Sequence, residues 1–124
     1  MTAPAPLDKV YLADILSAGG EELAREVTGT FLTEATRRMQ ALRDALGRPD
    51  WPGAAHAAHA IVSGASMLGL TAVSAAARDV EHMAGAQRTP TTDVLTALET
   101  LIQDAGPLLE QAIAELAPPP GPAA

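Results

Sequence analysis

Residues 58–70 read AHAIVSGASMLGL, and the organisation of the chain is clearest when it is read outward from this stretch. On an α-helix, residues three and four apart lie on the same side, so the stretch and the residues before it divide into two faces. One face is apolar and consists of Ala54, Ala57, Ile61, Ala65 and Leu68. The opposite face consists of His56, His59, Ser63 and Ser66. We therefore expect an amphipathic helix that buries its apolar face and presents the imidazole of His59 among short side chains, where another protein can approach it.

The composition favours an all-α domain. The chain has 124 residues, a length typical of one domain, and it is 48% hydrophobic but only 2% aromatic. The apolar residues are therefore mainly Ala, Leu, Val and Ile, which suit closely packed helices. Alternating β-branched runs and Asn-Gly or Asp-Gly hairpin turns, the usual signs of strands, do not occur.

The helix signals predict one short helix followed by four longer ones. The short helix is expected at about residues 7–17, ended by Gly19 and Gly20. The next helix, at about residues 21–46, has an apolar seam at three- and four-residue steps: Leu23, Val27, Phe31, Ala35, Met39, Leu42 and Leu46. Long helices joined by short turns favour an antiparallel four-helix bundle, here with a short additional N-terminal helix.

The remaining boundaries follow from capping residues and from proline and glycine. Asp50 is expected to cap the helix that carries His59, which ends near Gly69, and Thr71 is expected to cap the following helix, which Gly85 ends. The last helix starts at residues 89–92 and contains Pro107, but its apolar seam keeps phase, which predicts one kinked helix. Residues 7–117 are predicted to form the bundle, residues 1–6 a disordered arm, and residues 118–124 a Pro-rich disordered tail.

Charge and targeting signals exclude several classes of function. A net charge of −7 leaves no Lys- and Arg-rich face for nucleic acid. There is no cysteine for disulfide or thiol chemistry. The first residues lack the pattern of a signal peptide, and no apolar stretch is long enough to span a bilayer. We expect a cytoplasmic protein that does not associate with a membrane.

The residues around His59 resemble the signature of the histidine-containing phosphotransfer (HPt) domains of bacterial two-component phosphorelays. That signature is Ala-His, any residue, Leu or Ile, Lys, Gly, small residues, and then Leu or Phe followed by Gly. Further similarities are Phe31-Leu32, the Asp50-Trp51 turn and Val80-Glu81, and the resemblance extends over residues 8–116. The residues that fall in register with the signature, without a gap, are Ala58, His59, Ile61, Gly64, Ala65, Leu68 and Gly69.

The resemblance implies that His59 carries a phosphoryl group on Nε2 and exchanges it with an aspartate of a response-regulator receiver domain. It also implies that Glu81, at the position of the family's acidic residue on the following helix, orients the imidazole. Such a protein is a monomeric phosphocarrier in signal transduction rather than an enzyme, and its partners are a receiver domain and a sensor or hybrid histidine kinase. It needs no cofactor or metal of its own, because the receiver supplies the Mg²⁺.

Two positions depart from the family signature. The family's Lys is Val62 here and the following Gly is Ser63, so the chain lacks a cation beside the phosphoryl group. Ser63, Gly64 and Val62 are the expected contacts for the phosphoryl group or a partner, and Arg78 is a candidate replacement for the missing cation. A surface pair between Arg78 and Glu81, three residues apart, is the alternative for Arg78.

Other readings of the sequence stay open at this stage. A chain that has lost the lysine could be a transfer-deficient pseudo-HPt that binds a kinase or receiver and regulates it. A bundle that binds a metal or another ligand would require His56, His59 and His82 to converge. Labelling of His59 with phosphate separates the phosphocarrier from both of these alternatives.

Overall fold

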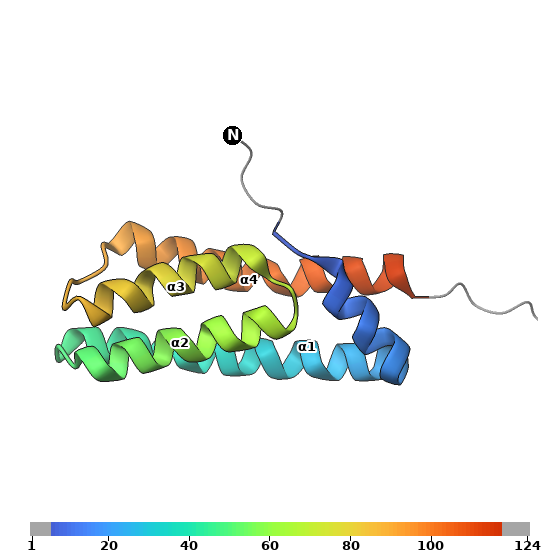
Figure 1. Cartoon of the computed structure of the whole chain (residues 1–124), viewed down its shortest axis with the longest axis horizontal. Helices are drawn as coiled ribbons and strands as arrows, with labels where there is room; N and C mark the ends of the chain where they lie inside the picture. Colours follow the sequence, from blue (N-terminus) through green and yellow to red (C-terminus); the bar gives the residue numbers. More distant parts are fainter. Residues whose placement is uncertain (1–5, 118–124) are drawn as a thin grey trace, which may run out of the picture.

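Four helices make up the part of the chain that the computed structural model describes, residues 6–117. They are α1 (Lys9–Gly47), α2 (Trp51–Met67), α3 (Thr71–Gly85) and α4 (Thr92–Leu116). Each helix packs against the next one along the chain, and α4 packs back against α1 (Figure 1). The described residues include no strand, so the prediction of an all-α antiparallel bundle is confirmed. The arm and the tail predicted from the sequence lie mostly outside the described residues.

The short N-terminal helix is present as the first part of α1. Gly20 has φ 72° and ψ −167°, a non-helical conformation that separates residues 9–19 from the long straight part of α1. Because side chains with a Cβ rarely adopt this φ, glycine is the residue suited to the break. The first part ends at the Gly19-Gly20 pair, as predicted, and it crosses the end of the bundle beyond α2 and α3 (blue in Figure 1).

The N-terminal part of α1 is attached to the turn between α2 and α3. The backbone N–H of Asp8 donates to the carbonyl oxygen of Gly69 at 2.7 Å. Gly69 has φ 73°, and a Cβ at this position would lie 2.2 Å from the carbonyl oxygen of Asp8. The turn therefore requires glycine both for its backbone conformation and for the close approach of residue 8.

One of the two predicted helix caps is confirmed and the other is wrong, and a residue of the predicted start of the last helix supplies a further cap. The side chain of Asp50 accepts a hydrogen bond from the N–H of Gly53 at 3.0 Å, and Thr91 accepts one from the N–H of Val94 at 3.2 Å. Thr71, however, is the first residue of α3, and the buried Leu70 occupies the cap position. The tight turn at Gly69 starts the helix one residue earlier than its polar side chain suggested.

The last helix is continuous through its proline. α4 contains Pro107 and runs from Thr92 to Leu116 without interruption, as its apolar seam predicted.

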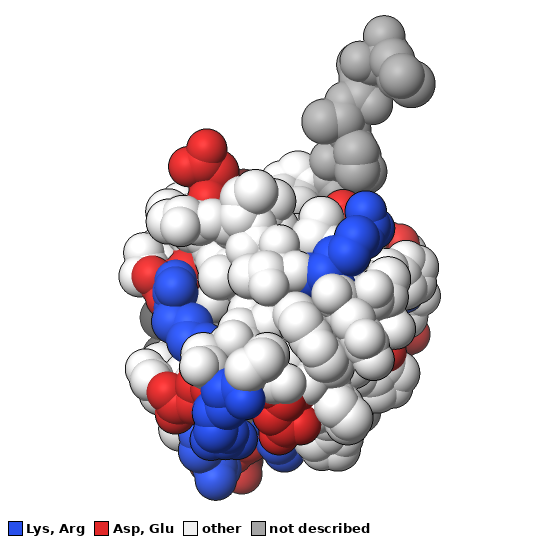
Figure 2. Space-filling view, turned by 90° about the vertical axis from the view of Figure 1, so that its left-hand side faces the viewer, with Lys and Arg blue, Asp and Glu red and all other residues white. Residues whose placement is uncertain are grey.

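Three ion pairs connect α1 with α4: Lys9 with Glu115 at 2.6 Å, Arg43 with Glu99 at 3.1 Å, and Arg25 with Glu110. Figure 2, which looks at the end of the bundle with the α1–α2 turn and the α3–α4 loop, shows basic and acidic side chains interspersed around uncharged surface.

The buried face of α1 is rotated slightly from the predicted seam. Phe31, Ala35, Met39 and Leu42 are buried as expected, but Leu23, Val27 and Leu46 are only half-buried. Ala24, Thr28 and Ala45 complete the buried face instead. The buried face turns in this way because α1 must contact both α2 and α4.

None of the helices between residues 6 and 117 is long and apolar enough to cross a membrane.

Candidate functional site

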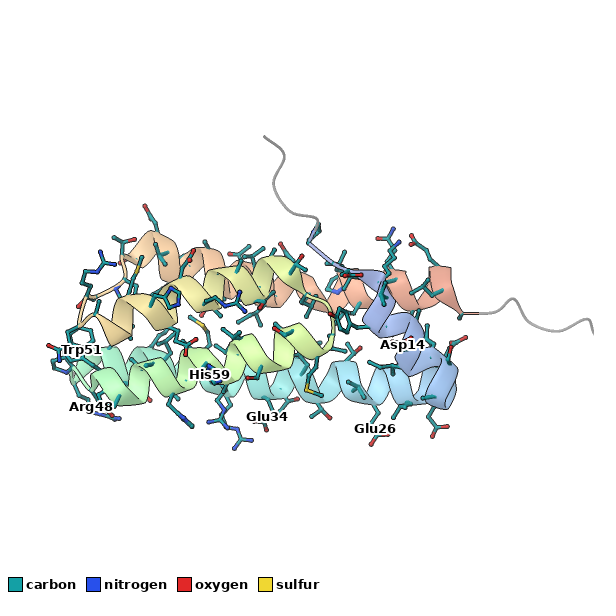
Figure 3. The ribbon with its side chains drawn as sticks, in the orientation of Figure 1. Asp14, Glu26, Glu34, Arg48, Trp51 and His59 are labelled. Carbon is teal, nitrogen blue, oxygen red and sulfur yellow. The ribbon has the colours of Figure 1, made fainter. Side chains whose placement is uncertain are left out.

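His59 lies near the middle of α2, away from both ends of the bundle (Figure 3). The Asp50 cap and the alanine-rich sequence start and sustain this helix, and its apolar face packs into the core through Ala57, Ile61 and Ala65. The side chain of His59 is 63% exposed. The helix therefore holds a solvent-accessible imidazole on a rigid element of the fold.

Glu81 on α3 contacts this imidazole. The Glu81 Oε2 lies 2.9 Å from Nδ1 of His59, and the Glu81 side chain is 28% exposed. Because an ionised carboxylate can only accept hydrogen bonds, this contact favours a ring proton on Nδ1, which in the neutral ring leaves the lone pair on Nε2. The structure therefore brings together the two residues that the sequence singled out.

A second contact between α2 and α3 lies beyond the His59–Glu81 pair. The hydroxyls of Ser66 and Ser74 are hydrogen bonded at 3.0 Å. Ser66 is on the predicted polar face of α2, whereas Ser74 is buried and was not identified from the sequence. Its signal in the sequence is its place two turns before Glu81, on the same face of α3. The two contacts together establish which residues of α2 and α3 lie opposite one another.

The structure divides the other predicted contact residues into three groups. Ser63 is exposed one helical turn after His59, and Arg78 is exposed on α3. Gly64 is half-buried, and a Cβ there would lie 3.2 Å from the ring of Phe31. Val62 is 7% exposed and belongs to the core, so the expectation that its side chain contacts phosphate or a partner is wrong. Its apolar side chain is buried in the core, as the hydrophobic effect favours.

The alternative pairings predicted from the sequence are not formed. Within residues 6–117, Arg78 makes no ion pair with Glu81, because the carboxylate of Glu81 binds His59. His56 and His82 are both exposed. No three His, Cys, Asp or Glu side chains of the described residues are grouped so that they could hold a metal ion.

An apolar groove of about 390 Å³ lies beside the histidine, between α1 and α2. Ala60 and Gly64 of α2 line it, and the side chain of Met67 at its edge is 71% exposed. Leu23 and Val27 of α1 face it, which explains why these two seam residues are only half-buried. The sequence did not reveal the groove, because it forms where α2 presents small side chains to the longer α1.

The comparisons with known proteins agree with this fold. The model of the Hpt domain family matches residues 26–117. The fold is similar to that in the crystal structure of histidine-containing phosphotransfer protein B from Pseudomonas aeruginosa PAO1, with a TM-score of 0.78. That match has 22% sequence identity and covers 92% of this chain and 98% of the other. No curated protein sequence matches the chain at a significant level. Because the family model covers most of the chain, the protein belongs to the Hpt domain family, the phosphotransfer modules of two-component phosphorelays.

Proposed function

We propose that the protein is a phosphorelay intermediate that carries a phosphoryl group on Nε2 of His59 and exchanges it with an aspartate of a receiver domain. The observation that carries the proposal is the hydrogen bond between Nδ1 of His59 and the carboxylate of Glu81. It supports a ring proton on Nδ1, which in the neutral imidazole leaves the lone pair on Nε2, the form that attacks phosphorus. Membership of the Hpt domain family supports the same chemistry.

The transfer step needs little from this chain beyond the imidazole. Nε2 attacks the phosphorus of the receiver's aspartyl phosphate, the P–N bond forms, and the P–O bond to the aspartate carboxylate breaks. The phosphorylated ring keeps its proton on Nδ1 and becomes an imidazolium, so its charge is balanced by the adjacent carboxylate of Glu81. The reverse step returns the phosphoryl group to an aspartate.

The remaining groups come from the partner. The receiver domain supplies Mg²⁺ and the acceptor aspartate, and a sensor or hybrid histidine kinase is the other expected partner. A partner that covers His59 also covers the adjacent groove, where Met67 offers an exposed apolar contact. We place this exchange in the cytoplasm, between a monomer of this protein and its partner, without turnover of a small molecule.

Labelling of His59 tests the proposal. Incubation with a phosphorylated receiver or an active kinase gives an acid-labile, base-stable label on the wild-type protein and none on His59→Ala. His56→Ala is a matched control, because His56 is an exposed histidine one turn earlier on α2. Equal labelling of wild type and His59→Ala contradicts the assignment of His59.

A second candidate function is a pseudo-HPt that binds a receiver or kinase without transferring phosphate. The absence of a lysine at Val62, where the side chain is buried in the core, favours this candidate. Tight binding of a receiver by a wild-type protein that takes up no label distinguishes it from the phosphocarrier.

A further inference from the structure

A phosphoryl group on His59 adds negative charge to a part of the molecule that is already acidic. The group would carry about two negative charges near neutral pH, and the carboxylate of Glu81 lies on the other side of the ring. The whole chain has a net charge of −7. A nearby cation would stabilise both the transition state and the phosphorylated product. The buried Val62 cannot provide it.

Few cations of the chain are available for this purpose. All eight Lys and Arg residues lie between residues 6 and 117, and five of them form ion pairs: Lys9, Arg25, Arg37, Arg43 and Arg48. The other three, Arg38, Arg78 and Arg88, have no acidic partner among the described residues. One of these three must therefore be close to His59 if the chain itself supplies the charge.

The pairing of α2 with α3 indicates which arginine this is. His59 lies opposite Glu81, and Ser66 lies opposite Ser74. Each step forward along α2 therefore corresponds to one step back along α3. By the same register Arg78, three residues before Glu81, lies opposite Val62, three residues after His59. Three residues of helix correspond to about 4.5 Å along the axis, which an extended arginine side chain readily spans.

The other two arginines are less well placed. Arg38 is on α1 and lines the groove with Ala60, on the side of α2 away from Glu81. Arg88 follows the C-terminal end of α3, where its N–H bonds the carbonyl oxygen of Met83 at 2.8 Å. Arg78, by contrast, is exposed on the helix that carries Glu81.

We infer that Arg78 binds the phosphoryl group of phosphorylated His59, so that the cation expected on α2 is supplied instead from the facing position of α3. The inference rests on the proposed function. An arginine can donate two parallel hydrogen bonds to phosphoryl oxygens, and the exposed hydroxyl of Ser63 can donate a further one. Arg78 would thus hold the reacting group from the α3 side while Glu81 holds the ring.

A phosphoryl donor that needs no partner protein tests the inference. Potassium phosphoramidate phosphorylates imidazoles: its own P–N bond breaks, ammonia leaves, and a P–N bond to the ring forms. The rate is measured by mass spectrometry of the wild type and four variants: Arg78→Gln, Arg78→Lys, Arg38→Gln and Arg88→Gln. Arg38→Gln and Arg88→Gln remove the same charge from the other two unpaired arginines.

We expect Arg78→Gln to lower the rate of His59 phosphorylation about five- to tenfold at low ionic strength, as for a charge-assisted contact at an exposed site. Arg78→Lys should restore most of the rate, and Arg38→Gln and Arg88→Gln should stay within about twofold of wild type. The difference between wild type and Arg78→Gln should shrink in high salt, because exposed charges are screened.

Two outcomes overturn the inference, and they are distinct. The role of Arg78 is refuted if wild-type protein is labelled on His59 no faster than Arg78→Gln, or if the labelling rate falls in Arg38→Gln instead. Either result leaves the phosphocarrier intact. Wild-type protein that takes up no label on His59 refutes the proposed function and this inference with it.

Discussion

Replacing Glu81 separates two contributions that its carboxylate makes to His59. Glu81→Ala removes both the hydrogen-bond acceptor and the charge. Glu81→Gln keeps a carbonyl oxygen that can accept from Nδ1–H but removes the charge. We expect both variants to phosphorylate more slowly than wild type, and Glu81→Ala to be the slower of the two.

The size of the effect follows from the geometry. The Nδ1 to Oε2 distance is 2.9 Å, but the side chains of His59 and Glu81 are 63% and 28% exposed, so water weakens the contact. Charge-assisted hydrogen bonds are worth about 1.5–3 kcal/mol, and partial exposure favours the lower end. Because about 1.4 kcal/mol corresponds to a factor of ten, we expect Glu81→Ala to slow phosphorylation about tenfold, and Glu81→Gln about threefold.

Two measurements check the prediction. The rate of phosphohistidine formation with phosphoramidate gives the loss of reactivity, and ¹⁵N NMR of the imidazole reports which ring nitrogen carries the proton. In Glu81→Ala the preference for the Nδ1–H form should be lost, and in Glu81→Gln it should be largely kept. Asp79→Asn is the matched control, because it removes an exposed charge two residues before Glu81 on a different face of α3.

Folded Glu81→Ala protein that reacts at the wild-type rate would refute this reasoning, since the hydrogen bond would then contribute nothing to reactivity. A fall of the same size in Asp79→Asn would also refute it, because the effect would then come from the overall charge of α3.

Three further predictions concern stability. Gly69→Ala should lower the free energy of unfolding by at least about 2 kcal/mol, because φ is positive at Gly69 and the Asp8 carbonyl is close. Gly29→Ala is the control: Gly29 lies in a helix with open space around it, so this change should raise the free energy of unfolding by about 0.5–1 kcal/mol. Denaturant titration measures both. Thr28→Val should raise the free energy of unfolding by about 1 kcal/mol, because the buried Thr28 hydroxyl has no hydrogen-bond partner, and the exposed Thr33→Val is its control. The hydrogen bond from Lys9 lowers the pKa of Glu115 below its usual 4.5, so the pair stabilises the fold above that pH and the stabilisation is lost as the pH falls further. The difference in Tm between wild type and Glu115→Gln should therefore disappear in acid. A difference that persists in acid would contradict the assignment.

The family resemblance predicted the pairing of His59 with Glu81, and the short turn between α2 and α3 explains the register that brings them together. His59 precedes Leu70 by as many residues as Glu81 follows it, so an antiparallel pair of helices with its turn at Gly69 and Leu70 places the two side chains opposite each other. Helical periodicity then orients both side chains to one surface. The same reasoning applied to position 66 would have identified Ser74.

What the sequence could not predict depends on the lengths of neighbouring helices. Periodicity identifies the apolar side of α1, but how far that side is covered depends on α2, which is shorter and carries Ala60 and Gly64 at the contact. Leu23 and Val27 were therefore assigned to the core although they face the groove. Val62 shows the opposite error, since the family motif suggested an exposed position where the side chain is buried in the core.

These experiments are informative because the residues expected to take part in the reaction are different from the residues that pack in the core. His59, Ser63 and Arg78 are exposed and Glu81 is half-buried, so their side chains contribute little to the core. Val62 and Gly64, between or beside them on α2, contact the interior and Phe31. Substitutions in the first group should change reactivity in a folded protein, and substitutions in the second group should change stability first. A loss of phosphorylation in the first group can then be attributed to the reacting groups themselves.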